Sequence, residues 1–292
     1  MTVSEIFNFL DKQYPCDTAC DFDNVGLLVG DGGQEVRKAL IALDCTSKVI
    51  NEAITCGCQL IITHHPVIFS PIKNVLSDSI AYTLIKNNIS VISMHTNLDI
   101  AKNGGVNSCL CKALGIENTE IYSANDGYAL QFGYVAPTTA DDFANRIKTA
   151  LGGCVKYVDG KKEIQKVLVC SGSGGDFVYE AIKGGFDALV TADVKHHQFL
   201  DAVENNISLF DGGHFNTEDI VIELSDLESG HKTGARISHE EIEFLKDKIY
   251  YIMGGTILLL VILIIISSCS SSNGDYSSIE ENMKKLPKWL LT

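Results

Sequence analysis

Positive charge is scarce in this chain. It contains 23 Lys and Arg against 37 Asp and Glu, which gives a formal net charge of −14. Proteins that bind nucleic acid neutralise phosphates with many basic side chains, so this deficit argues against a nucleic-acid partner. The acidic excess favours solubility and the binding of cations.

A secretory leader is also missing from the first residues. MTVSEIFNFL has no basic stretch, apolar core or cleavage site. The ten cysteines are scattered over 292 residues, so we expect reduced, cytosolic thiols. The pairs Cys56/Cys58 and Cys109/Cys111 leave one residue between them, whereas zinc sites usually leave two to four. We therefore interpret both pairs as structural.

The standard phosphate-binding motifs are absent. SGSGGD (171–176) follows an apolar run, and its backbone amides could hold a phosphate. It lacks both G-x-G-x-x-G and the Walker lysine. The stretch NGGVN (103–107) predicts a turn.

Charge disappears altogether near the end of the chain. IYYIMGGTILLLVILIII (249–266) has no charged residue, and its length is close to the minimum for a membrane span. Basic residues precede it, which predicts cytoplasmic main domains anchored by a single C-terminal span. A second reading stays open, because the run and the small residues before Cys269 are similar to a lipoprotein signal that a fusion or frame accident has placed here.

An internal repeat predicts the fold class. Residues 39–63 align without a gap on residues 167–191, with six identities, and each stretch reads as a βαβ unit. We expect an α/β fold of two related α/β domains that arose by internal duplication. The expected domains are residues 1–125 and 126–225, followed by a polar linker (226–248), the apolar segment (249–267) and a polar tail (268–292).

Histidines and carboxylates follow three predicted strands. LIIT ends on His64 and His65, ISVISM ends on His95 in HTNLD, and SLFDGG ends on His214 in HFNTE. Ligands bind α/β sheets at the carboxyl ends of parallel strands. The neighbours His64 and His65 can address two metals, or one metal and a supporting group.

Two carboxylates accompany these imidazoles. Asp99 and Glu218 each lie four residues after a histidine and add the negative charge that lets two cations sit close together. A helix is expected to start near Thr217 or Glu218. The second histidine pair, His196 and His197, is displaced in the repeat alignment, and we place it on a helix with a structural role.

A set of motifs resembles a known family. In order, DFDNVGLLVG, ITHHP, HTNLD, GGVN, SGSGG and GGHFNTE resemble the segments of the Nif-three-like dinuclear metal center proteins, also called GTP cyclohydrolase I type 2 homologues. The resemblance covers roughly residues 3 to 224. It implies two related α/β domains, two divalent metals and a homohexamer.

The resemblance also implies roles for single residues. His64, His65, Asp99, His214 and Glu218 become the metal ligands, and His95 a nearby ligand or catalytic proton shuttle. Asp23 and Asn24 are expected to support the site. After GGHFNTE the chain departs from the family pattern, so we expect the closing strand of the fold to be missing or replaced.

Two functions remain open at this stage. The first is a metal-dependent hydrolase, with a nucleotide substrate implied by the resemblance to GTP cyclohydrolases. The second is a non-catalytic metal-binding assembly or regulatory protein. Imidazole with carboxylate suits zinc, iron, manganese or nickel, so the identity of the metal is open.

Overall fold

The computed structural model describes residues 1–125, 127–226 and 235–238. The described residues form two compact units, one of residues 1–95 with 222–226 and 235–238, the other of residues 96–125 and 127–221. The expected first domain ended at residue 125. The first compact unit ends earlier, because the segment after residue 95 packs within the second.

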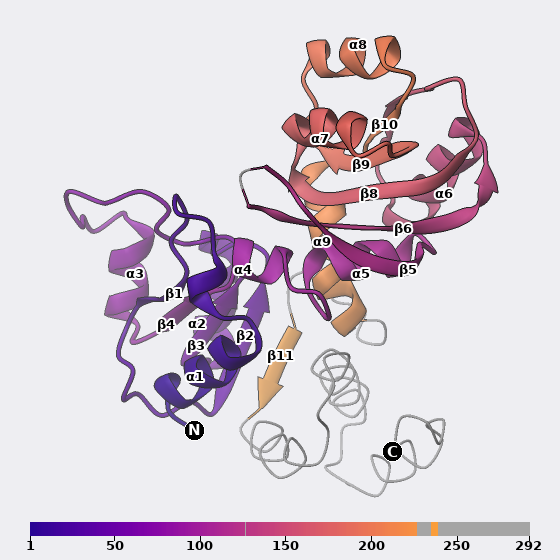
Figure 1. Ribbon diagram of the computed structural model, residues 1–292. Coiled ribbons are helices and arrows are strands. Elements are labelled where there is room, and N and C mark those ends of the chain that lie inside the picture. Colours follow the sequence, from indigo (N-terminus) through magenta and orange to yellow (C-terminus); the bar gives the residue numbers. More distant parts are fainter. Residues whose placement is uncertain (126, 227–234, 239–292) are drawn as a thin grey trace, which may run out of the picture. The chain divides into compact units, whose positions relative to one another are not determined.

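The first unit is a five-stranded sheet in the order β1-β4-β3-β2-β11, with three parallel strands at its centre. Its edge strands β1 and β11 run antiparallel to their neighbours. The elements of this unit are α1 Val3–Gln13, η1 Cys16–Thr18, β1 Gly26–Val29, β2 Lys38–Ala42, α2 Ser47–Cys56, β3 Leu60–Thr63, α3 Ile80–Lys86, β4 Ser90–Ser93 and β11 Ala235–Ser238 (Figure 1).

The second unit is a six-stranded sheet in the order β5-β6-β8-β9-β10-β7, again with three parallel strands, β8, β9 and β10. Its elements are α4 Thr96–Asp99, α5 Val106–Ala113, β5 Glu117–Ser123, β6 Ala129–Thr138, α6 Ala140–Leu151, β7 Lys156–Val158, β8 Ile164–Ser173, η2 Gly175–Phe177, α7 Val178–Lys183, β9 Ala188–Ala192, α8 His196–Glu204 and β10 Ser208–Asp211. The last helix, α9 His214–Asp226, begins in this unit and continues past its final residue, 221.

The two βαβ units expected from the repeat are present, and their strands share one register. Ala39 of β2 pairs with Leu60 of β3, and Val167 of β8 pairs with Ala188 of β9. Both partners are shifted by the same 128 residues (167 minus 39, and 188 minus 60). The α/β class with two sheets is thus confirmed, while its origin by duplication stays a prediction.

Burial explains why the repeat was visible in the sequence. The aligned identities Leu40 and Leu168 are fully buried in the two cores, as are Ala53 and Ala181. Gly57 has φ 67° at the end of α2, and Gly185 has φ 64° after α7. This left-handed conformation costs glycine little, so glycine is favoured at both helix ends.

The closing strand of the fold was expected to be missing or replaced; the first alternative is wrong, and the second stays a prediction. Residues 235–238 form β11, which pairs antiparallel with β2, with Arg236 opposite Leu40 (Figure 1). Backbone pairing needs no particular side-chain pattern, which is why the polar sequence around it was read as a linker. The apolar segment 249–267 lies outside the described residues. Within the part that is described, no helix is long and apolar enough to cross a bilayer.

Candidate metal centre

Three histidines meet at one end of the first sheet. β3 and β4 are parallel neighbours, with Thr63 opposite Ser93, so the residues that follow them leave the sheet side by side. The ring centroids of His64, His65 and His95 lie 4.9 to 5.5 Å apart. Each ring offers a nitrogen within 4.8 Å of the others. The strand-end argument therefore correctly predicted that these imidazoles gather.

Each of the three rings uses its Nδ1 atom to contact an oxygen. The partner of His64 is the carbonyl of Met94 at 3.0 Å. The partners of His65 and His95 are the carboxylates of Asp44 at 2.9 Å and Asp23 at 2.8 Å. A carbonyl or an ionised carboxylate can only accept, so Nδ1 carries the hydrogen and Nε2 keeps its lone pair in the neutral ring. Histidines that bind metals are commonly oriented in this way.

Asp44 was not identified from the sequence. It lies just after β2, the strand next to β3, and its signal was the same as that of the histidines, a polar side chain at a strand end. Asp23 was expected to support the site, and its buried carboxylate does contact His95. The supporting carboxylates thus come from two segments that the sequence separates from the histidines.

The three histidines of the cluster differ in their exposure to solvent. His64 is buried, with 3% of its surface exposed. The side chains of His65 and His95 keep 24% and 17% of their surface exposed. A small ligand could therefore reach the cluster past His65 and His95.

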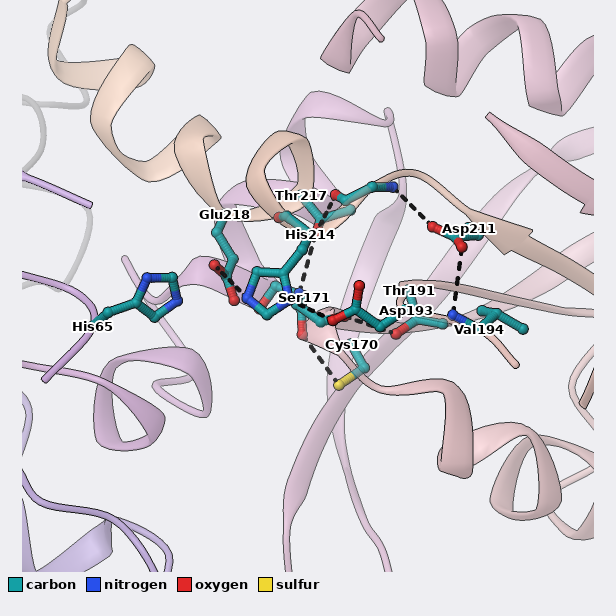
Figure 2. A network of polar contacts seen from close by, with 12 residues as sticks. His65, Cys170, Ser171, Thr191, Asp193, Val194, Asp211, His214, Thr217 and Glu218 are labelled. Atoms are coloured by element: carbon teal, nitrogen blue, oxygen red, sulfur yellow. Dashed lines mark hydrogen bonds and ion pairs between the residues drawn. The ribbon is translucent and has the colours of Figure 1, made fainter. Parts of the chain in front are cut away.

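The second unit holds an imidazole and carboxylates of its own (Figure 2). Nδ1 of His214 lies 2.7 Å from Oδ2 of Asp193, and its Nε2 lies 3.1 Å from Oε2 of Glu218. α9 begins at His214, not near Thr217 or Glu218 as expected. His214 and Glu218 therefore lie one helical turn apart on the same face.

Thr217 explains why the helix start was misplaced. A threonine followed by glutamate is typical of a helix N-terminus. Here the Thr217 hydroxyl donates to the His214 carbonyl at 2.9 Å and accepts from the Gly172 amide at 3.0 Å. Figure 2 shows Thr217 among these polar contacts. A tertiary contact to β8 therefore uses the side chain that looked like a cap.

Gly172 lies against the carboxylate of Glu218. It has φ 59°, and a Cβ atom at this position would overlap Oε1 of Glu218. The contact with Glu218 therefore explains why the SGSGG motif has a glycine at position 172. Its glycine lets the chain turn and lets the Glu218 side chain approach the backbone.

The two carboxylates raise the pKa of His214 to about 9, from an ordinary 6.5. The hydrogen bond with Glu218 is the largest cause, and Asp193 adds to it, while burial acts in the opposite direction. His214 is therefore a protonated imidazolium between two carboxylates at neutral pH. A metal ion bound at Nε2 would replace that proton.

Asp99 is buried at the end of the short helix α4, with 5% of its surface exposed. The hydroxyl of Ser171 donates to its Oδ1 at 3.2 Å, and the Ser171 amide donates to Oδ1 of Asn107 at 2.7 Å. Asn107 ends the NGGVN stretch, for which a turn was predicted, but in the structure it lies in the first turn of α5. The start of α5 and the SGSGG segment thus meet around Asp99.

Other candidates remain apart from these groups. His196 and His197 are exposed at the start of α8, as expected for a pair on a helix. Cys58, Cys109 and Cys111 are buried. Burial raises the pKa of Cys111 to about 12, so it stays a thiol, as a structural role predicts.

The donor set fits a divalent metal. Imidazole and carboxylate are ligands of zinc, iron, manganese and nickel. The first unit supplies three imidazoles with converging nitrogens. The second unit supplies the imidazole of His214 and two buried carboxylates, those of Glu218 and Asp99.

Comparison with known proteins supports the resemblance. The family profile described as Duf34/NIF3 (NGG1p interacting factor 3) matches residues 1–245, which ends just before the apolar segment. A protein of Clostridium acetobutylicum named GTP cyclohydrolase 1 type 2 homolog is 36% identical over 249 residues, covering 80% of this chain and 92% of its own length.

Two solved structures have the same fold. A hypothetical protein of Staphylococcus aureus is 33% identical with a TM-score of 0.71, and the match covers 78% of this chain and 90% of the other. A Bacillus cereus protein related to NIF3 is 25% identical with a TM-score of 0.69, covering 76% and 90%.

Proposed function

Because the chain belongs to the Duf34/NIF3 family, we propose that it binds two divalent metal ions and uses them to hydrolyse a nucleotide. The proposed ligands are His64, His65, Asp99, His214 and Glu218. The observation that carries the proposal is the orientation of the imidazoles. The three proposed histidine ligands and their neighbour His95 each place Nδ1 against an oxygen acceptor. This arrangement presents Nε2 to a metal, and it is shared by His64, His65, His95 and His214.

The number of ligands favours a catalytic centre over a closed structural one. Five ligands, or six with His95, give each of two metals at most three when they divide evenly and each binds one ion through one atom. Structural zinc sites are closed by four protein ligands, whereas catalytic sites keep a position for water. The partial exposure of His65 and His95 gives water and substrate a way in.

The chain's own residues have distinct roles in this proposal. Two bound ions would supply a water molecule whose pKa is lowered toward neutrality. Asp23 holds His95 with its hydrogen on Nδ1, so Nε2 of His95 carries the lone pair that can accept a proton from a reacting group. The buried carboxylates of Asp99 and Glu218 offset the positive charge of the ions. A nucleotide substrate is proposed from the name of the relatives, GTP cyclohydrolase 1 type 2 homolog.

Elemental analysis tests the proposed metal binding. We expect about two metal ions per chain in the purified protein. The variants His65→Ala and Glu218→Ala should lose metal while their circular dichroism stays that of the parent. His196→Ala, which removes an exposed histidine from α8, is the control and should keep both ions. Equal metal content in all four proteins would contradict the proposal.

Turnover separates the two functional hypotheses. Incubation of the metal-loaded protein with GTP and other nucleotides should give a product that the two ligand variants do not form. Two bound metals without turnover of any nucleotide would favour the non-catalytic assembly protein. The homohexamer is part of the same proposal, and light scattering should give a mass close to six chains.

A further inference from the structure

Two phenylalanines are exposed beside the histidine cluster. Phe22 is 66% exposed and Phe69 is 52% exposed, although phenylalanine is among the residues most often buried. Their ring centroids lie 6.4 Å apart with an interplanar angle of 52°. Single exposed apolar residues are common on protein surfaces, whereas adjoining ones form the kind of patch that marks a binding or interaction site.

The pair is connected to the residue that we propose moves the proton. The ring of Phe69 packs edge-on against His95, with centroids 6.3 Å apart and an interplanar angle of 82°. Phe22 directly precedes Asp23, whose carboxylate holds His95. A ligand that lies on these rings is therefore within reach of the His95 imidazole.

A hydrogen bond fixes the two aromatic segments to each other. The side-chain amide of Asn24 donates to the carbonyl of Ile68 at 2.5 Å. Asn24 follows Asp23, and Ile68 precedes Phe69, so this bond joins the backbones that carry the two rings. The segments that carry the rings are therefore joined through Asn24, the neighbour of the residue that holds His95.

The chemistry of these segments favours a ring over a phosphate as the ligand. Residues 19–25 and 66–76 contain two aspartates and one lysine, so they offer little positive charge to an anion. Aromatic faces bind flat rings by stacking, and ring centroids 4.5 to 7 Å apart are favourable. Stacking on an aromatic side chain tolerates any nucleobase because every base has a π-face.

We propose that Phe22 and Phe69 bind the purine ring of the substrate and place its reacting atom beside His95. This inference rests on the proposed function, because it assigns the base-binding part of the same site. The metal ligands are not involved in holding the ring. Loss of either phenylalanine should therefore weaken nucleotide binding without removing metal.

Calorimetry with two probes tests the assignment on the full-length, metal-loaded protein. GTP carries both a purine and phosphates, whereas inorganic triphosphate carries no ring. We expect Phe22→Ala and Phe69→Ala each to weaken GTP binding about tenfold or more and to leave triphosphate binding and metal content unchanged. Phe69→Tyr keeps the aromatic face and should restore most of the GTP affinity that Phe69→Ala loses. Leu76→Ala removes another exposed apolar residue of the same loop and should have no effect.

Several results would overturn the assignment. One is unchanged GTP affinity in both alanine variants, and another is an equal loss of GTP and triphosphate binding. A change in assembly mass by light scattering, with GTP affinity unchanged, would make the rings a contact between copies of the chain. A metal-loaded parent that does not bind GTP would overturn the ring assignment but leave the metal proposal intact.

A failure of the proposed function has a different signature. If the parent holds no metal, saturation-transfer NMR with guanosine, which has no phosphate, tests the rings alone. Guanosine signals that depend on Phe22 and Phe69 would then support the ring assignment without the metals. Signals that are absent, or equal in the variants, would overturn it.

Discussion

Asp23 and His95 are 72 residues apart in the chain, yet Oδ1 of Asp23 accepts a hydrogen bond from Nδ1 of His95 at 2.8 Å. The Asp23 side chain is fully buried, and its own Oδ1 also accepts from the Asn24 amide at 2.8 Å. This carboxylate therefore has a fixed position from which it sets the orientation and the tautomer of the imidazole.

Asp23→Asn should lower turnover by about 10- to 100-fold, as is typical for residues that orient a histidine at a metal site. An asparagine can offer its NH₂ group to Nδ1, which favours the tautomer with the hydrogen on Nε2, so Nε2 could no longer accept a proton. The rate of nucleotide turnover by the metal-loaded protein checks this. Asp21→Asn changes an exposed carboxylate of the same segment and should leave that rate as in the parent. If both variants behaved alike, the carboxylate would have no orienting role.

Gly172→Ala should lower metal affinity by displacing Glu218. Its Cβ atom would overlap the Glu218 carboxylate, and its φ of 59° adds strain of about 1 to 2 kcal/mol. Gly185→Ala is the matched control, because Gly185 has φ 64° but nothing within 4 Å of the added Cβ. We expect chemical denaturation to show a similar loss of stability in both variants, and metal analysis to show a loss only in the first. Retention of metal by Gly172→Ala would contradict the role given to this contact.

The raised pKa of His214 predicts how the metal-free protein responds to pH. The folded pKa of about 9 lies above the ordinary value of 6.5, so protonation of His214 favours the folded state. This contribution is complete below about pH 6.5 and is lost as the pH rises through about 9. An NMR titration of the His214 ring in metal-free protein should give a midpoint near 9.

Asp193→Asn should lower that midpoint, because it removes one of the two carboxylates that raise the pKa of His214. Asp176→Asn, at an exposed position of η2, should not. Metal binding should also release this proton, so the heat of binding at pH 7.5 should vary with the ionisation enthalpy of the buffer. A midpoint near 6.5 in the parent would show that the carboxylates do not act on His214.

Deletion of residues 227–292 should expose the edge of the first sheet, because β11 pairs with β2 through residues 235–238. Amides of β2 should exchange with deuterium faster in the shortened chain. Those of β9, in the second sheet, should keep their rates, because no strand is removed beside them. Unchanged exchange in β2 would show that this edge does not depend on β11.

Apolar periodicity in the sequence was enough to predict the α/β class and both βαβ units. Strand and helix periods are local properties, and the positions that matched in the repeat, such as Leu40 and Leu168, are buried in the cores. The gathering of His64, His65 and His95 was also predictable. Parallel strands end at one edge of a sheet, so residues that follow neighbouring strands must lie close together.

Contacts between distant segments could not be predicted in this way. The sequence marks Asp44 and Asp193 only as polar residues after strands, and the sheet decides that they face His65 and His214. β11 depends on backbone pairing, which leaves little trace in side-chain pattern. Thr217 resembled a helix cap, but its hydroxyl accepts a hydrogen bond from the distant Gly172 amide. The sequence by itself thus determined the architecture and the residues available for metal chemistry, because these follow from local pattern. The tertiary structure decided which atom each imidazole presents, because that is set by hydrogen bonds to partners 20 or more residues away: His64, His65, His95 and His214.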